Sequence, residues 1–162
     1  PYAYRPFADL YSADLSGADL YRANLTGANL ARTDLTGSDL FRAELTGANL
    51  SRANPPGANL ARTDLTIANL YGANFYGAVL IGADFYASWL ESANFSYADL
   101  TNVSNVNTAV WTNSNLFGAT LPDGYDQAWF ESEGAIFAVP EPSSYALLFG
   151  GLALGLVALP RR

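Results

Sequence analysis

The chain has 162 residues, with 15 acidic and 8 basic side chains and a formal net charge of −7. It contains no Cys and no His, which excludes disulfides, thiolate metal sites and nucleophilic catalysis by a Ser-His-Asp or Cys-His arrangement. The acidic balance differs from that of a nucleic-acid-binding surface, so we expect no nucleic-acid partner. Because no catalytic constellation of residues is present, we also expect no enzymatic activity and no cofactor.

From Ala8 to Thr101 the sequence repeats every five residues, in nineteen consecutive units. The third residue of each unit, called here the centre, is Leu in fifteen units, Phe in three and Pro in one. The residue two positions before the centre is Ala in fifteen units, and the residue directly before it is Asp or Asn in sixteen. A repeat this regular predicts a solenoid.

A period of five excludes a continuous strand, because side chains along a strand alternate between faces every two residues. Each unit must therefore contain a turn that restarts the alternation of inward and outward side chains. Ala-Asx-Leu fits a three-residue strand with Ala and Leu inward and Asx outward, and the next two residues, often ending in Gly, fit a corner. A helix is disfavoured, because apolar residues spaced by five form no stripe on it.

The pattern A-(D/N)-(L/F)-x-x over residues 8–124 resembles that of the pentapeptide-repeat proteins. The resemblance implies an all-β fold, a right-handed quadrilateral β-helix with four units, or twenty residues, in each coil. Centres twenty residues apart then stack in four columns, named here by their first members: the Leu10, Leu15, Leu20 and Leu25 columns. The three Phe centres fall in the opposite Leu15 and Leu25 columns, which predicts a change from Leu to Phe packing towards the C-terminal end.

The register slips once after Leu100. We expect one extra residue near Val103, after which units resume as Ser104-Asn105-Val106 and continue to Leu121. The repeats then make about six coils, and a spacing of about 4.8 Å per coil gives a tube about 28 Å long. Leu-Pro-Asp-Gly at 121–124 is a stop signal.

Both ends of such a tube expose unpaired backbone that must be covered. Residues 1–7 are expected to be an N-terminal cap or a truncated lead-in. Residues 125–138 intersperse aromatic with acidic side chains, which favours a cap or an acidic linker; a disordered spacer is the alternative.

Residues 139–162 form a different kind of segment. Val139-Pro140-Glu141-Pro142 precedes an apolar run at 145–159, and the chain closes with Arg161 and Arg162. This order resembles the PEP-CTERM sorting signal of Gram-negative bacteria. The resemblance implies a short hydrophobic α-helix that anchors the protein in the membrane until an exosortase, a membrane transpeptidase, processes it. An ordinary tail anchor is the alternative.

That resemblance also implies export to the cell envelope, the cell surface or the extracellular matrix. Exported proteins of this kind carry an N-terminal signal peptide, and no charged region with an apolar core precedes Ala8. We therefore expect the chain to lack the beginning of its precursor.

Outward positions that follow the centres carry the candidate interaction surface, for a protein or polysaccharide partner. An aromatic and aliphatic belt encircles one coil, and a stripe precedes Ile81 in its column; together these residues are Tyr21, Phe41, Tyr71, Tyr76, Ile81 and Tyr86. The alternative is that Tyr is simply a favourable strand residue.

Charged side chains also recur in columns. Glu44, Asp64 and Asp84 stack at twenty-residue spacing, and oxygen ligands of this kind suit Ca²⁺. A surface ladder of mixed charge is favoured over a calcium site, because Arg42 and Arg62 lie two residues before two of these acids. Arginine recurs every ten residues from 22 to 62, on two opposite corners, where it forms either anion-binding strips or a solubilising surface.

The sequence therefore predicts a non-catalytic, exported scaffold that binds partners on its outer surface. The alternative comes from the family: some pentapeptide-repeat proteins mimic duplex DNA and bind DNA gyrase. The arginine columns and the C-terminal segment both oppose that alternative.

Overall fold

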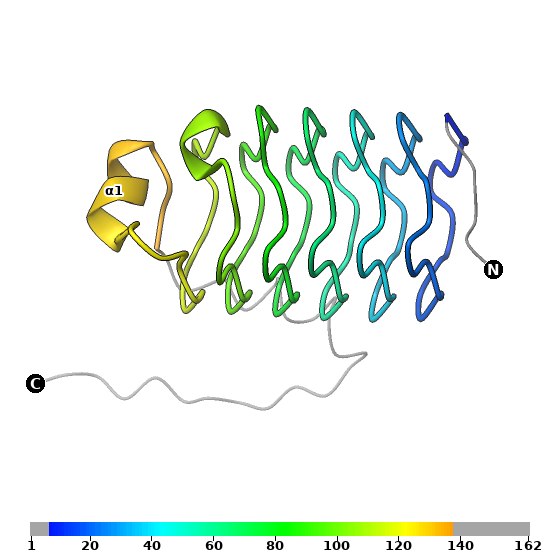
Figure 1. Cartoon of the computed structure of the whole chain (residues 1–162), viewed down its shortest axis with the longest axis horizontal. Helices are drawn as coiled ribbons and strands as arrows, with labels where there is room; N and C mark the ends of the chain where they lie inside the picture. Colours follow the sequence, from blue (N-terminus) through cyan, green and yellow to red (C-terminus); the bar gives the residue numbers. More distant parts are fainter. Residues whose placement is uncertain (1–6, 138–162) are drawn as a thin grey trace, which may run out of the picture.

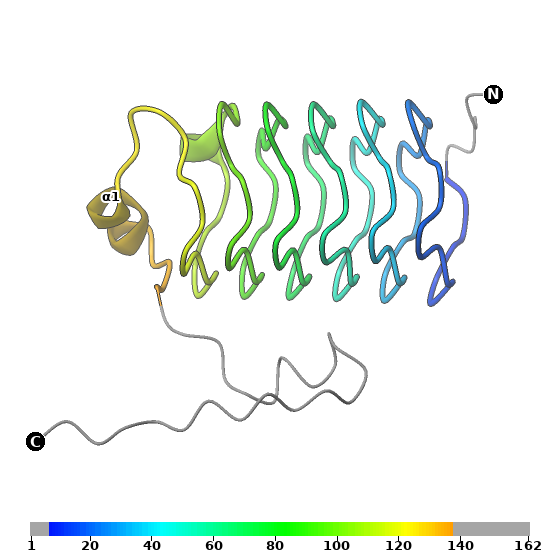
Figure 2. The same cartoon turned by 90° about the horizontal axis from the view of Figure 1, so that it is seen from below.

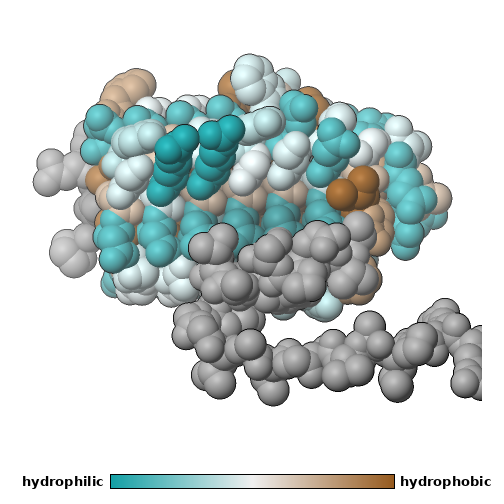
Figure 3. Space-filling view, turned by 180° about the vertical axis from the view of Figure 1, so that it is seen from behind, coloured by the Kyte–Doolittle hydropathy of each residue, from teal (hydrophilic) through white to brown (hydrophobic). Residues whose placement is uncertain are grey.

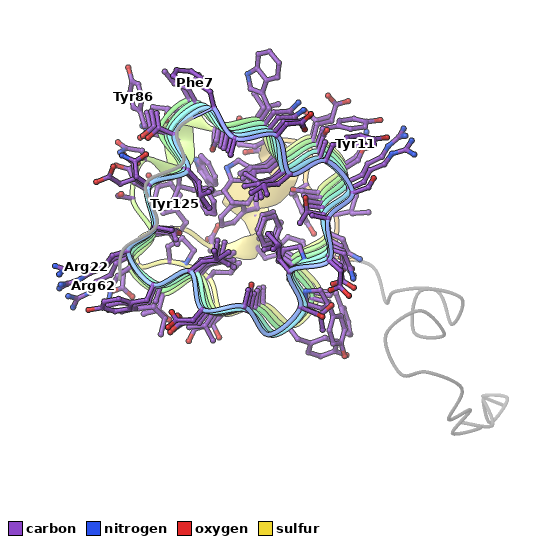
Figure 4. All side chains as sticks on the ribbon, turned by 90° about the vertical axis from the view of Figure 1, so that its right-hand side faces the viewer. Phe7, Tyr11, Arg22, Arg62, Tyr86 and Tyr125 are labelled. Atoms are coloured by element: carbon purple, nitrogen blue, oxygen red, sulfur yellow. The ribbon has the colours of Figure 1, made fainter. Side chains whose placement is uncertain are left out.

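The computed structural model describes residues 7–137, which wind into a tube of stacked coils (Figure 1). Parallel bridges join residues twenty positions apart, from Asp9 and Asn29 to Asp84 and Ser104. One coil therefore takes four units. The view along the tube shows a four-sided outline (Figure 4). The β-helical solenoid predicted from the repeat is confirmed.

Each side of a coil is held by backbone hydrogen bonds to the next coil. Leu10 N donates to Asn29 O at 2.8 Å, and Asn29 N donates to Ala8 O at 2.8 Å. Within residues 7–137 each bridge stands alone and no longer strand forms, so the predicted three-residue strands reduce to single bridging Asx residues. The described helices are the short 3₁₀ helix η1 (Val106–Thr108) and the α-helix α1 (Gln127–Ser132).

The geometry of the corners explains which residues occupy the remaining positions of the repeat. The residue two positions after each centre has a positive φ, whether it is Gly17 at 64° or Arg32 at 58°. The Asx side chain closes the same turn: Asp39 Oδ1 accepts the amide of Phe41 at 3.0 Å. Asp and Asn are favoured before the centre because their side chains bond the backbone two residues on.

Ala and centre side chains fill the interior in the four predicted columns. The expected change to Phe packing is confirmed: the rings of Phe75 and Phe95 stack with centroids 5.0 Å apart, and Phe85 meets Phe95 edge-on at 6.1 Å. Trp111 continues the Leu10 column and packs against Phe85 and Phe95. The interior is therefore closely packed with apolar side chains.

The extra residue lies further along the chain than expected. Ser104 still pairs with Asp84, twenty positions away, whereas Val110 pairs with Trp89, twenty-one positions away. Val103 is buried in the small-residue slot of a regular unit. Val103 itself is therefore not the extra residue; the slip falls just after Ser104, two residues further on, and the expected centre at Val106 is confirmed.

The helix η1 accommodates the extra residue. Asn105 occupies the centre position but turns away with a left-handed φ of 59°, and Val106 is buried in its place. The indole N–H of Trp111 donates to Val106 O at 2.9 Å. A polar side chain at a centre would be unsatisfied in this core, so the chain shifts by one residue and places an apolar side chain there.

Residues 121–137 fold back over the last coil (Figure 2). Asp126 caps α1, where its carboxylate accepts the amide of Trp129 at 2.8 Å. Phe130 is buried against Trp111, and Ile136 then returns to pair with Asn115. The sequence did not predict a helix in this segment.

Two expectations fall on the ends of the chain. Residues 1–6 of the N-terminal lead-in and the segment 138–162, with its hydrophobic run, lie outside the described residues. Between residues 7 and 137 no helix combines the length and apolarity needed to cross a membrane.

Candidate functional site

The outward residues of the predicted belt lie on four different sides of the tube. Tyr71, Tyr76, Ile81 and Tyr86 follow successive centres of one coil, so each stands near a different corner. Tyr71, Ile81 and Tyr86 are exposed, and Tyr76 is half-buried. The belt therefore encircles the tube and offers no single partner a continuous contact.

Tyr21 and Phe41 do form a stack. Their rings lie 5.8 Å apart with planes inclined by 7°, on successive coils. Arg22 and Arg42 lie over these rings, with the guanidinium carbons 5.8 and 5.3 Å from the respective ring centroids. The buried side chain of Ala61 stands between this stack and Ile81 in the same column, so the predicted stripe is interrupted.

A second aromatic row forms where the sequence did not indicate one. Tyr76 meets Tyr97 edge-on at 5.4 Å, and Tyr97 meets Phe117 at 5.6 Å. A Cβ at Gly118 would lie 2.8 Å from the Tyr97 ring, which shows how closely that ring lies on the backbone. Tyr76 and Phe117 directly follow their centres, whereas Tyr97 lies at the corner two residues after its centre, so the row does not appear as one column in the sequence.

The acid column consists of carboxylates that are each bound by protein donors. Glu44 accepts from Asn24 Nδ2 at 2.7 Å, and Asp84 accepts from Asn105 Nδ2 at 2.7 Å. Burial raises the pKa of Asp64, but hydrogen bonds from Thr66 and Thr46 outweigh it and leave the pKa below its ordinary value. In the part of the chain described, no group of three or more acidic side chains is placed to hold a metal ion. The geometry therefore does not favour calcium at Glu44, Asp64 and Asp84.

The arginines lie on two opposite corners, as the repeat predicts. Figure 4 shows Arg22 and Arg62 projecting from one corner and Tyr11, which marks the Leu10 column, near the opposite one. No ion pair joins Arg32, Arg42, Arg52 or Arg62 to a carboxylate of residues 7–137. The mixed-charge ladder favoured by the sequence, in which neighbouring acids would compensate these arginines, is therefore not formed by direct pairing.

A groove of about 490 Å³ lies along the corner that carries Arg32 and Arg52. We call it the Arg32–Arg52 groove. Its lining comes from three adjacent columns of the surface. These columns are Asn29, Asn49 and Asn69 before the centres, Tyr11, Ala31, Ser51 and Tyr71 directly after them, and Arg32 and Arg52 at the corner.

The order of residues along these columns gives the groove its shape. Tyr11 and Tyr71 stand three coils apart at its two ends, and the small side chains of Ala31 and Ser51 lie between them. Figure 3 shows the side of the tube opposite that of Figure 1, where hydrophilic side chains form rows along the axis. Sequence reasoning found the arginines and Tyr71 but missed Tyr11 and the asparagines, although their twenty-residue spacing was visible.

The predicted sorting motif is made of Val139, Pro140, Glu141, Pro142, Arg161 and Arg162. All six residues lie outside the described range of 7–137. The structure therefore does not test the motif.

The coils, the apolar interior and the outward Asx ladders define a non-globular repeat protein of the β-helix class. A family model described as pentapeptide repeats matches residues 7–42, 38–68 and 68–104, in eight copies. These ranges make up more than half of the chain, which therefore belongs to the pentapeptide-repeat family. The comparison with curated protein sequences finds no match.

Solved structures of the same family are similar to this chain. The pentapeptide repeat protein Rfr23 from the cyanobacterium Cyanothece 51142 shares 28% identity, covers 68% of this chain and 85% of its own, and has a TM-score of 0.58. HetL, a pentapeptide repeat protein involved in heterocyst differentiation regulation from Nostoc sp. strain PCC 7120, shares 31% identity over 85% of this chain and 67% of its own, with a TM-score of 0.36.

The similarity extends at lower identity to QnrB1, a plasmid-mediated fluoroquinolone resistance protein. It shares 17% identity over 91% of this chain and 93% of its own, with a TM-score of 0.41. Rfr23 supports the β-helical fold.

Proposed function

We propose that this protein is a non-catalytic interaction scaffold, sorted to the cell envelope or surface through residues 139–162. The observation that carries the scaffold function is the packed interior: Leu, Phe and Ala side chains fill the tube of residues 7–137, so chemistry is confined to its outer surface. The outer surface presents regular polar ladders and small groups of aromatic rings, which suit contact with a partner.

The sorting half of the proposal rests on sequence. A Pro-Glu-Pro motif, an apolar run at 145–159 and a terminal pair of arginines follow one another in the order that the PEP-CTERM resemblance implies. The terminal arginines would hold the end of the run at the cytoplasmic face. An exosortase-type transpeptidase is the partner implied, with the membrane as a transient anchor.

The sorting proposal is tested by fractionation of the full-length precursor in a host that has an exosortase. We expect the intact protein to be exported, processed near Pro140–Pro142 and recovered at the envelope or surface. A form without residues 139–162 should be exported without being anchored or processed.

Point variants separate the motif from the apolar run. Pro140→Ala with Glu141→Gln should abolish processing and leave the protein in the membrane. Ser143→Ala with Ser144→Ala, directly beside the motif, should be processed normally. Recovery of both the intact and the shortened form in the cytoplasm would refute the proposal.

A further inference from the structure

We propose that the Arg32–Arg52 groove binds a short segment of an acidic carbohydrate, with carboxylated or sulfated sugars as its ligand. The inference rests on the scaffold function proposed above and gives it a ligand class. It does not depend on the sorting signal, because binding is measured on purified protein. Loss of sorting and loss of binding are therefore separate results.

The first argument is the positive charge at the groove. Arg32 and Arg52 lie on successive coils, about 4.8 Å apart along the tube, and neither forms an ion pair with residues 7–137. The nearest acid in sequence, Asp34, instead accepts from the Thr36 amide at 2.9 Å and from Thr36 Oγ1. Two guanidinium groups are therefore available for an anion, which they can bind with paired N–H donors.

The second argument is the row of amides on the other side of the groove. Asn29 and Asn49 use their side-chain oxygens to accept the amides of Ala31 and Ser51, at 3.3 and 3.1 Å. Their amide nitrogens donate along the ladder, Asn29 Nδ2 to Asp9 Oδ1 at 3.0 Å and Asn49 Nδ2 to Asn29 Oδ1 at 3.4 Å. Asn69 Nδ2 donates to no atom in the described part of the chain. Of these three amides, that of Asn69 therefore remains to donate to a ligand, beside the two guanidinium groups, and it suits an acceptor oxygen.

The third argument is shape. Tyr11 and Tyr71 close the ends, and the small side chains between them leave a volume of about 490 Å³. Binding sites for small molecules have volumes of roughly 300–1,000 Å³. An aromatic ring with a polar hydroxyl offers an apolar face and a hydrogen bond together. Sugar rings, which have apolar faces and polar edges, match that combination.

Charge at the ends of the groove limits the length of the ligand. Asp9 lies beside the Tyr11 end, and Glu91 follows Tyr71 by one coil in the same column. The whole chain carries a net charge of −7. A long polyanion such as duplex nucleic acid would be repelled beyond the two arginines, whereas a segment of a few sugars would contact mainly the groove.

The test is an isothermal calorimetric titration of the purified full chain with a tetramer of galacturonic acid. The methyl ester of the same tetramer keeps the sugar rings and removes the carboxylate charges. We expect the acid to bind and the ester to bind at least about tenfold more weakly, because charge-assisted hydrogen bonds are lost. Added salt should weaken binding of the acid.

Matched variants locate the site. Arg32→Gln with Arg52→Gln should reduce affinity about tenfold or more, whereas Arg42→Gln with Arg62→Gln on the opposite corner should leave it unchanged. Tyr71→Ala should weaken the acidic tetramer but leave an acidic peptide such as tetraglutamate unaffected. Thermal unfolding of each variant confirms that the exposed substitutions leave the fold intact.

A gain of affinity is also expected from one substitution. Gly72 continues the Arg32 column, has a φ of +62°, and a Cβ there would lie 3.6 Å from Arg52 Cγ, in ordinary contact. Arginine already adopts φ values of 53–58° at the corners of this tube. Gly72→Arg should therefore extend the pair to three guanidinium groups and tighten binding of the acidic tetramer.

Three results would overturn the proposal. One is the absence of binding by the acidic tetramer and by a sulfated tetramer of comparable length. Another is an equal loss of affinity in the two arginine double variants, which would indicate charge attraction without a site. The last is tighter binding of tetraglutamate than of either sugar, which would make the groove a site for acidic peptides.

Discussion

The ring of Phe130 in α1 meets the indole of Trp111 edge-on, with centroids 4.9 Å apart and planes inclined by 85°. Trp111 is the last large residue of the Leu10 column, so this contact joins the repeat core to the helix that follows it. Both side chains are fully buried. The pair is the point at which the solenoid is closed towards its C-terminal end.

Replacement of Phe130 by Ala should therefore destabilise the protein strongly. Removal of a fully buried Phe costs about 3–5 kcal/mol, through lost burial and the cavity left behind. Urea unfolding of the full chain measures the change in the free energy of unfolding. Glu133→Gln, at the exposed C-terminal end of α1, is the control and should change stability little; an equally small effect of Phe130→Ala would show that α1 does not close the core.

Ile67 occupies a corner with a φ of 56°, in the left-handed region. This conformation costs a residue with a Cβ about 1–2 kcal/mol, and the side chain, 60% exposed, recovers little by burial. Ile67→Gly should stabilise the protein by about 0.5–1 kcal/mol, since glycine loses part of the gain to chain entropy.

The reverse substitution provides the matched control for Ile67. Gly47 lies one coil earlier in the same column, with a φ of +65° and open space around it. Gly47→Ile should destabilise by about 1–2 kcal/mol. Denaturant midpoints of the two variants should therefore move in opposite directions, and a shift in the same direction would contradict the role of φ.

The pKa of Asp64 depends on the neighbouring threonines. Burial raises it, but the Thr66 hydroxyl and amide and the Thr46 hydroxyl, at 2.8 Å, together hold it below the ordinary 3.8. Since the folded pKa lies below the unfolded one, this carboxylate stabilises the fold above pH 3.8, and the contribution is lost as the pH falls through the folded pKa.

Thr66→Val removes one of these donors and should raise the pKa of Asp64, as measured by carboxyl NMR titration. Acid unfolding should then begin at a higher pH. Thr101→Val is the control, because the Thr101 hydroxyl donates to Asp99 at 2.6 Å and does not contact Asp64. An unchanged Asp64 titration in Thr66→Val would show that the Thr66 hydroxyl does not contribute and that the Thr66 amide and the Thr46 hydroxyl hold the carboxylate.

The protein should not inhibit DNA gyrase. A mimic of duplex DNA needs a continuous negative surface, and this tube carries arginines along two opposite corners, of which Arg32, Arg42, Arg52 and Arg62 are without an ion pair among residues 7–137. A supercoiling assay with residues 1–138 checks this expectation. Strong inhibition would favour the gyrase-binding function over the envelope scaffold.

The sequence predicted the fold because its signal is strictly local. Each five-residue unit carries its own inward pair, its outward Asx and its corner, and this unit repeats nineteen times in the sequence. Counting residues at twenty-residue intervals gives the columns and the opposite placement of the arginines. It also gives the change to Phe centres at Phe75, Phe85 and Phe95. The helix α1 was missed, because six residues with an Asp126 cap give too short a pattern to identify.

The sequence by itself determined which residues face inward and which share a column, since these follow from the period of five and the twenty-residue coil. Only the tertiary structure showed that Asn105 is the extra residue, because its polar side chain is exposed while the apolar side chain of Val106 is buried in the core. It also decided what the outward side chains do. Asp34 bonds to Thr36, and Arg32 forms no ion pair among residues 7–137; that choice among competing donors depends on distances that a sequence does not contain.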